Sequence, residues 1–330
     1  MRRVRAARAA GTAEWVYDSA SGAGIGKLAA MVSAPDPKLK APCTVANTTQ
    51  TSGNRAGRWF TYDEFGNVQE ATECTDGENF VTTYGYDSFG RQSLVTYPAV
   101  GDGSRFAAEY RYNKAGFLYY VADGSDHKPC WVATAMNAAG QVTGEQTRNG
   151  VVTSSTRNPA TGWLLGTTAT SVANNSAVIQ DLAFTYDEVG NLQKRTRAMT
   201  AETADSTEKF GYDLLDRLTS AETKIPSAAN YDVTESYAYD SIGNLTQKGG
   251  KTYAYSGCPT GGPHAVCTVG ESTGYSYDQN GNMVAGNGRT LSYNSFNKVT
   301  SIAGGPDGSS ATVDFMYGAD GHRYRGARDL

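Results

Sequence analysis

The sequence predicts an all-β protein in which tandem β-hairpins form one continuous, twisted and curved sheet. Three observations lead to this prediction: a recurring Tyr-Asp motif, a glycine three residues after the Asp, and a second aromatic two residues before the Tyr. The 330 residues include 38 glycines and 21 tyrosines, and the mean hydropathy is −0.47. Such a composition is typical of many tight turns between half-buried aromatic strands, and not of a helical core.

The motif recurs along nearly the whole chain, which indicates a repeat architecture. Ten copies begin at Tyr62, Tyr86, Tyr112, Met136, Tyr186, Tyr212, Tyr239, Tyr277, Tyr293 and Tyr317. Most steps between copies are 24 to 27 residues. Longer steps contain a degenerate copy around Arg157–Pro159 and a half copy at Tyr253–Tyr255, and Trp15–Leu28 reads as a copy with a lengthened loop.

Two columns of the alignment predict the turn of each hairpin. The residue after the lead aromatic is Asp or Asn in nine copies and Gly318 in the tenth, and Asx side chains accept a backbone N–H two positions on. Three residues further on, eight copies have Gly and two have Asp or Asn, the residues that best tolerate positive φ. Together they predict a three-residue hairpin loop that ends in a left-handed residue. The predicted turn residues are Asp63, Gly66, Asp87, Gly90, Asn113, Gly116, Asn137, Gly140, Asp187, Gly190, Asp213, Asp216, Asp240, Gly243, Asp278, Gly281, Asn294, Asn297 and Gly321.

Aromatic residues two positions apart predict one ring-bearing face on the sheet, because alternate residues of a strand point to the same side. The rings expected to share this face are Phe60, Tyr84, Tyr86, Phe184, Tyr186, Phe210, Tyr212, Tyr237 and Tyr239. After each turn an aliphatic residue such as Val68 or Leu192 begins the returning strand.

The segment Phe184–Leu192, with the sequence FTYDEVGNL, resembles the repeats of the RHS/YD-repeat family. That family includes bacterial RHS and wall-associated proteins, the C component of insecticidal Tc toxins and the extracellular teneurins. The likeness covers about Trp15 to Arg325 and implies a sheet that spirals into a hollow shell, which in bacterial members encloses a C-terminal toxin. The family's Asp-Pro-x-x-Gly core motif does not occur here, so self-cleavage is not expected. We expect a disordered or irregular N-terminus over residues 1–14, a YD/RHS repeat shell segment over 15–325 and an irregular C-terminus over 326–330.

Charge and hydropathy narrow the classes of partner. The net charge of −4 comes from interspersed charges of both signs, which does not favour nucleic acid. No run of 18 apolar residues occurs, so no membrane span is expected. The basic start, Met1–Arg8, is not followed by an apolar segment, so an export signal is not expected, and a gene fragment would begin in this way. A secreted or cell-envelope location is implied only by the family resemblance.

Several local motifs resemble phosphate-binding or metal-binding patterns but match them poorly. Ser21–Leu28 departs from the phosphate-loop pattern at its first and last positions, so a flexible hairpin loop is the preferred interpretation. The three histidines, His127, His264 and His322, lack a second close pair of ligands, so we expect neither a metal nor a cofactor. Cys258 and Cys267 flank a turn-rich loop; a local disulfide and two free thiols are equally open interpretations.

No catalytic residue is predicted. Paired carboxylates for glycoside cleavage must face each other across a cleft of about 5–9.5 Å, whereas each repeated Asp is expected to be engaged in its own turn. The leading hypothesis is a non-catalytic segment of a shell that encloses a C-terminal polymorphic toxin, with the rest of the shell or the toxin as partner. The alternative is a cell-surface module that binds carbohydrate or a partner through its tyrosine rings. A degraded gene fragment without an independent function is the third possibility.

Overall fold

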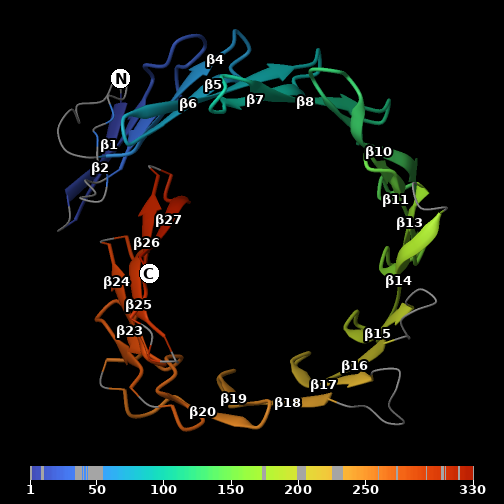
Figure 1. Ribbon diagram of the computed structural model, residues 1–330, viewed down its shortest axis with the longest axis vertical. Helices are drawn as coiled ribbons and strands as arrows, with labels where there is room; N and C mark the ends of the chain where they lie inside the picture. Colours follow the sequence, from blue (N-terminus) through green and yellow to red (C-terminus); the bar gives the residue numbers. More distant parts are fainter. Residues whose placement is uncertain are drawn as a thin grey trace. The chain divides into compact units, whose positions relative to one another are not determined.

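The computed structural model describes residues 2–8, 11–33, 39, 41, 43, 55–172, 176–198, 206–224, 233–258, 260–272, 274–294, 296–305, 308, 310–318 and 320–329. Over these ranges the chain forms 27 β-strands, and consecutive strands run next to each other in chain order (Figure 1). None of the described residues belongs to a helix with the length and apolarity needed to cross a lipid bilayer. The all-β hairpin array predicted from the repeats is therefore confirmed.

The chain divides into two compact units. The first comprises Met1–Ala108, Tyr255–Cys267 and Ser272–Leu330, and the second comprises Glu109–Ala254 and Thr268–Glu271. The strands of the first unit are β1 (Arg2–Arg8), β2 (Gly11–Tyr17), β3 (Leu28–Val32), β4 (Gly57–Tyr62), β5 (Val68–Thr75), β6 (Glu78–Tyr86), β7 (Gln92–Ala99), β22 (Ser276–Tyr277), β23 (Met283–Gly286), β24 (Arg289–Tyr293), β25 (Val299–Gly304), β26 (Thr312–Tyr317) and β27 (Arg323–Asp329). The strand β8 (Arg105–Tyr112) crosses the boundary.

The second unit contains β9 (Leu118–Asp123), β10 (Pro129–Met136), β11 (Val142–Thr147), β12 (Val151–Arg157), β13 (Leu164–Ser171), β14 (Ala177–Tyr186), β15 (Leu192–Ala198), β16 (Ser206–Tyr212), β17 (Leu218–Lys224), β18 (Val233–Tyr239), β19 (Leu245–Lys248), β20 (Lys251–Ala254) and β21 (Thr268–Val269). Strands β1 to β21 belong to one sheet of 21 strands, and β22 to β27 form a second sheet of six. The described strands therefore form two sheets, where a single continuous sheet was expected.

The two ends of the chain correct the expected domain limits. Residues 1–14 were expected to be irregular, but Arg2–Arg8 pairs with Gly11–Tyr17 as an antiparallel hairpin. Residues 326–330 were also expected to be irregular, but β27 continues to Asp329 and pairs with β26. The Tyr-Asp motif is absent from both ends, yet both ends form paired strands, so a segment without the motif can still belong to the sheet.

Each Tyr-Asp turn is joined to its strands through a shift in register. In β4–β5 the pairing shifts between Thr61 and Tyr62, and the same shift precedes Tyr86 in β6–β7 and Tyr212 in β16–β17. One extra residue on the incoming strand is the bulge that accompanies a three-residue loop with a left-handed last residue.

Buried residues are concentrated in the first unit. Val16, Ala29, Ala30, Val32, Cys43 and Cys74 form a cluster with exposed fractions of 5% or less. Leu39, Ala56 and Met316 form a smaller cluster. Along most other strands the side chains are half-buried or exposed, because the sheet is a single layer there. Isolated hairpins are marginal in water, so contacts between successive hairpins must stabilise such a sheet.

Candidate functional site

The repeated element of this fold is the turn, and the turn at Asp63 illustrates it. The Asp63 N–H donates to the carbonyl of Asn67 at 2.9 Å, and the Gly66 N–H donates to the carbonyl of Asp63 at 3.1 Å. The Asp63 Oδ1 atom accepts the backbone N–H groups of Phe65 and Asn67 at 3.0 and 2.7 Å. Its Oδ2 atom accepts the Asn67 side-chain amide at 3.0 Å. One carboxylate therefore closes the loop and also orients the residue at which the returning strand starts.

The same geometry recurs along the chain. All ten copies have both backbone hydrogen bonds. In the nine Asx copies the Oδ1 atom accepts two backbone N–H groups, or three at Asp187. The left-handed residues include the two that are not glycine, with φ of 59° at Asp216 and 58° at Asn297. Positive φ is also found at Gly66, Gly90, Gly116, Gly140, Gly190, Gly243, Gly281 and Gly321.

The turn carboxylates are held in their charged form. The side-chain amide of Asn67 lowers the pKa of Asp63, and the side chain of Arg91 lowers the pKa of Asp87. At Asp213 the backbone N–H of Arg217 is the largest cause of a lowered pKa. Each of these carboxylates makes its hydrogen bonds within its own turn, so the structure does not bring them together as an acid–base pair.

A second repeated contact was not anticipated from the sequence: in seven copies the hydroxyl of the lead tyrosine ties the hairpin to the segment before it. The Tyr86 hydroxyl donates to the carbonyl of Val68 at 2.8 Å, and Val68 begins the returning strand of the preceding repeat. We call this contact a tyrosine latch. The described residues include these latches, at 2.7–2.9 Å: Tyr62 to Leu28, Tyr86 to Val68, Tyr212 to Leu192, Tyr239 to Leu218, Tyr277 to Val266, Tyr293 to Met283 and Tyr317 to Val299.

The latch explains a difference between the two aromatic columns. Nine of the ten lead residues are Tyr and none is Phe, whereas the column two residues earlier contains both Phe and Tyr. Burial raises the pKa of Tyr62, Tyr86, Tyr212 and Tyr293, so these hydroxyls remain protonated donors. The preference for Tyr over Phe at the lead position was the sequence signal from which the latch could have been inferred.

The ring pairs lie within strands, as the repeat predicts. Phe60 lies on β4, Tyr84 and Tyr86 on β6, Phe184 and Tyr186 on β14, Phe210 and Tyr212 on β16, and Tyr237 and Tyr239 on β18. Residues two apart on a strand share a face, so each pair presents its two rings to one side. That all the pairs share one side of the sheet remains a prediction.

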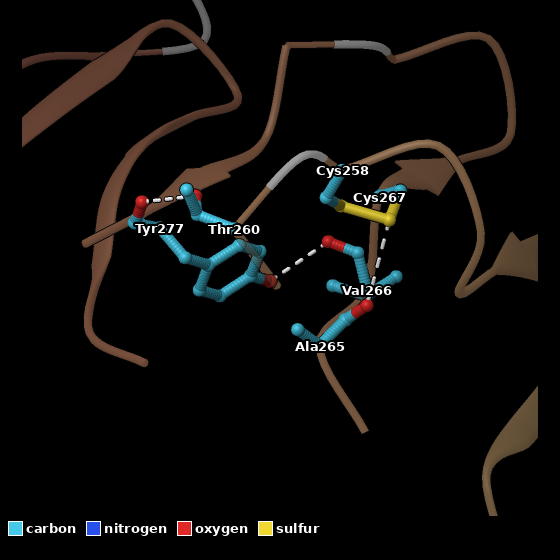
Figure 2. Close-up of a disulfide and its surroundings, with 6 residues drawn as sticks. All are labelled: Cys258, Thr260, Ala265, Val266, Cys267 and Tyr277. Atoms are coloured by element: carbon cyan, nitrogen blue, oxygen red, sulfur yellow. Dashed lines mark hydrogen bonds between the residues drawn. A yellow bond between two sulfur atoms is a disulfide. The ribbon is translucent and has the colours of Figure 1, made fainter. Parts of the chain in front are cut away.

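One latch depends on a disulfide loop. Cys258 and Cys267 are bonded, with their Cα atoms 5.4 Å apart, and the loop between them presents the Val266 carbonyl to the Tyr277 hydroxyl (Figure 2). The Thr260 hydroxyl donates to the carbonyl of Tyr277 from the same loop (Figure 2). The loop therefore takes the place of the preceding returning strand. A second disulfide, Cys43–Cys74, joins residues 31 positions apart and was not predicted, and Cys130 is a free thiol.

The Ser21–Leu28 loop and two of the histidines, which the sequence offered as candidate binding motifs, make contacts with neighbouring parts of the fold. The Ser21–Leu28 loop packs on the next hairpin, where Tyr62 N–H donates to the Ser21 carbonyl at 3.1 Å and Ala23 N–H to the Asp63 carbonyl at 3.3 Å. His127 Nδ1 lies 2.9 Å from Glu109, and His322 Nδ1 lies 3.2 Å from Asp320. Among the described residues no three His, Cys, Asp or Glu side chains are grouped as metal ligands would be.

The fold is a YD-repeat sheet, a ladder of Asx-turn hairpins that in this chain is joined by tyrosine latches. Residues 139–326 match the family model described as teneurin YD-shell, and residues 62–99 match the RHS repeat. The chain belongs to the teneurin YD-shell family, whose members are structural shell proteins.

Relatives with this repeat include toxin components. Toxin subunit YenC1 of Yersinia entomophaga is 31% identical over 152 residues, which cover 42% of this chain and 15% of the relative. The crystal structure of a TcdB2–TccC3–Cdc42 complex matches 99% of the chain with a TM-score of 0.67 at 17% identity. A Tc holotoxin pore from Photorhabdus luminescens matches 97% with a TM-score of 0.65, also at 17% identity. The chain spans only 19% and 18% of those two structures, and the likeness shows a shared fold.

Proposed function

We propose that this chain is a non-catalytic part of the wall of a YD-repeat shell, and that the shell encloses a toxic C-terminal polypeptide. The observation that carries the proposal is the row of tyrosine latches, each of which bonds a hairpin to the segment before it. A wall made of a single layer of sheet needs such bonds, because few of its side chains are buried.

The kind of cargo and its location are inferred from relatives. One relative is named as a toxin subunit, and the structural neighbours are Tc toxin assemblies. A shell around a toxic polypeptide protects the producing cell from that polypeptide. Because the toxin acts on other cells, we place the protein outside the cell or in its envelope. The partners are the rest of the shell and the enclosed polypeptide.

Limited proteolysis of the full-length protein that contains this chain tests the proposal. The polypeptide that follows the shell should resist a broad-specificity protease, and it should become sensitive when Tyr212→Phe, Tyr239→Phe and Tyr293→Phe together weaken the wall. Replacement of Tyr84 by Phe serves as the control, since Tyr84 lies in the other aromatic column. A polypeptide that is digested as fast within the full-length protein as when it is expressed alone would contradict the proposal.

A carbohydrate-binding surface is the second candidate, and one feature favours it. Tyr97 and Phe106 stack with ring centroids 5.9 Å apart and planes at 26°, and they are 42% and 50% exposed. Exposed, rigid aromatic faces suit the apolar face of a sugar ring. Calorimetry with cell-wall oligosaccharides should then show binding that Tyr97→Ala and Phe106→Ala abolish, and no heat with any of them would remove this candidate.

A further inference from the structure

The turn between β26 and β27 docks on the β4–β5 pair of the same compact unit. The Asp320 carboxylate of this turn lies 3.0 Å from the guanidinium of Arg58 on β4. Met316, which precedes the turn, packs with Leu39 and Ala56, and all three are at most 7% exposed. The Arg58–Asp320 contact joins residues 262 positions apart in the sequence.

This turn departs from the other nine in a way that fits docking. Gly318 occupies the position that is Asp or Asn elsewhere. A Cβ atom at Gly318 would lie 3.1 Å from Oε1 of Glu73 on β5, tighter than ordinary contact. The missing carboxylate is supplied two residues later, because Asp320 Oδ1 accepts the His322 N–H at 2.9 Å. With the acid two residues later, no side chain at position 318 crowds β5, and Asp320 Oδ2 lies within reach of both the Arg58 guanidinium and the His322 ring.

The docked turn places two acids beside one arginine. Arg58 and Glu73 are cross-strand partners in the β4–β5 pair, and Asp320 approaches Arg58 from the turn. The charged groups that face Glu73 are Asp320, Arg58 and His322. With Glu73 and Asp320 both ionised, Arg58 is the only permanent cation of this group, so the carboxylates repel each other across the docking contact.

We propose that the turn between β26 and β27 is a proton-sensitive clasp, which holds this hairpin on β4–β5 while Glu73 is protonated and loosens as Glu73 ionises. The clasp controls whether the β26–β27 hairpin stays docked on β4–β5. This inference stands on the docking geometry and does not depend on what the shell encloses.

The direction of the pH effect follows from the two acids. Burial, and then Asp320, raise the pKa of Glu73, so its contribution to docking is present at low pH and lost as pH rises through that raised value. For Asp320, burial raises the pKa, but the His322 N–H, the His322 ring and Arg58 outweigh it and the net shift is downward. Its contribution is present above the ordinary Asp range and lost as pH falls through the lowered value. The clasp is therefore strongest between these two titrations and weaker above the pH at which Glu73 ionises.

The ε-methyl of Met316 reports the clasp in NMR spectra of the intact chain labelled at methionine methyl groups. A soluble paramagnetic agent should leave this signal sharp at pH 5 and broaden it severalfold more at pH 8. Met31, which is 7% exposed on β3, provides an internal control that should stay sharp at both values. Met316→Leu assigns the signal.

Three variants separate the clasp from general unfolding. Glu73→Gln should keep Met316 protected at both pH values, and Asp320→Asn should leave it unprotected at both, with Met31 unchanged. Asp87→Asn is the matched control, because its carboxylate bonds only within its own turn, and it should keep the wild-type pH response. Equal protection of Met316 at pH 5 and pH 8 in the wild type, a pH response that persists in Glu73→Gln, or full protection in Asp320→Asn would each overturn the proposal.

Discussion

Replacing Tyr86 by Phe tests the tyrosine latch with a single atom. The change deletes the hydroxyl that donates to the Val68 carbonyl at 2.8 Å and leaves the ring in place. A typical intramolecular hydrogen bond contributes about 0.5–1.5 kcal/mol net, and a half-buried carbonyl loses its partner here as well. We expect the free energy of unfolding to fall by about 1 kcal/mol.

Tyr84→Phe is the matched control for this change. Tyr84 lies on the same strand, two residues earlier, and within the described part of the chain its hydroxyl has no hydrogen-bond partner. We expect its loss to change the free energy of unfolding by less than about 0.5 kcal/mol, as for an ordinary surface substitution.

Urea unfolding at neutral pH measures both variants, and the dependence on urea concentration should keep the wild-type slope. Tyr86→Phe, Tyr212→Phe and Tyr239→Phe lie in separate hairpins, so the three losses should add to about 3 kcal/mol. Equal stabilities for Tyr86→Phe and Tyr84→Phe would show that the hydroxyl does not stabilise the ladder, and the latch would then have to be abandoned as an explanation of the repeat.

Three further predictions concern the turns and a disulfide. Gly190→Ala should lower the free energy of unfolding by about 1–2 kcal/mol, because its backbone is left-handed. The loss should exceed that of Gly243→Ala in the same urea assay, because a Cβ at Gly190 would lie 2.8 Å from a tryptophan ring whereas one at Gly243 meets nothing within 4 Å. Cys43→Ala should lower the free energy of unfolding by about 4 kcal/mol, because it removes a bridge that restricts a loop of 31 residues in the unfolded chain. Equal stability of the wild type under oxidising and reducing conditions would contradict this. The Asp213 carboxyl has a lowered pKa, so its stabilisation is lost as pH falls below about 4, and Asp213→Asn should show a smaller loss of stability between pH 5 and pH 3 than the wild type.

The turns could be predicted from the sequence because their chemistry is local. An Asx residue and a left-handed residue three positions later fix the loop whatever surrounds it, which is why Asp216 and Asn297 could be assigned positive φ beside eight glycines. The strands between turns follow from the spacing of the rings.

Contacts between repeats could not be predicted in the same way. The acceptor of each latch is a backbone carbonyl, which every residue has, so only the donor leaves a mark in the sequence, as a column of Tyr without Phe. The Cys43–Cys74 bond depends on how a long connection returns to β5. Docking of the last turn on Arg58 depends on a contact between distant segments, and its only local sign is Gly318 in the place of an Asx residue.

A cryo-EM structure of the full-length protein that contains this chain tests the central claim most directly. The account predicts that residues 15–325 form part of a closed wall, with the latched tyrosines in place and density for another polypeptide on the inner side. A structure in which both faces of this sheet are open to solvent and no polypeptide is enclosed would contradict it.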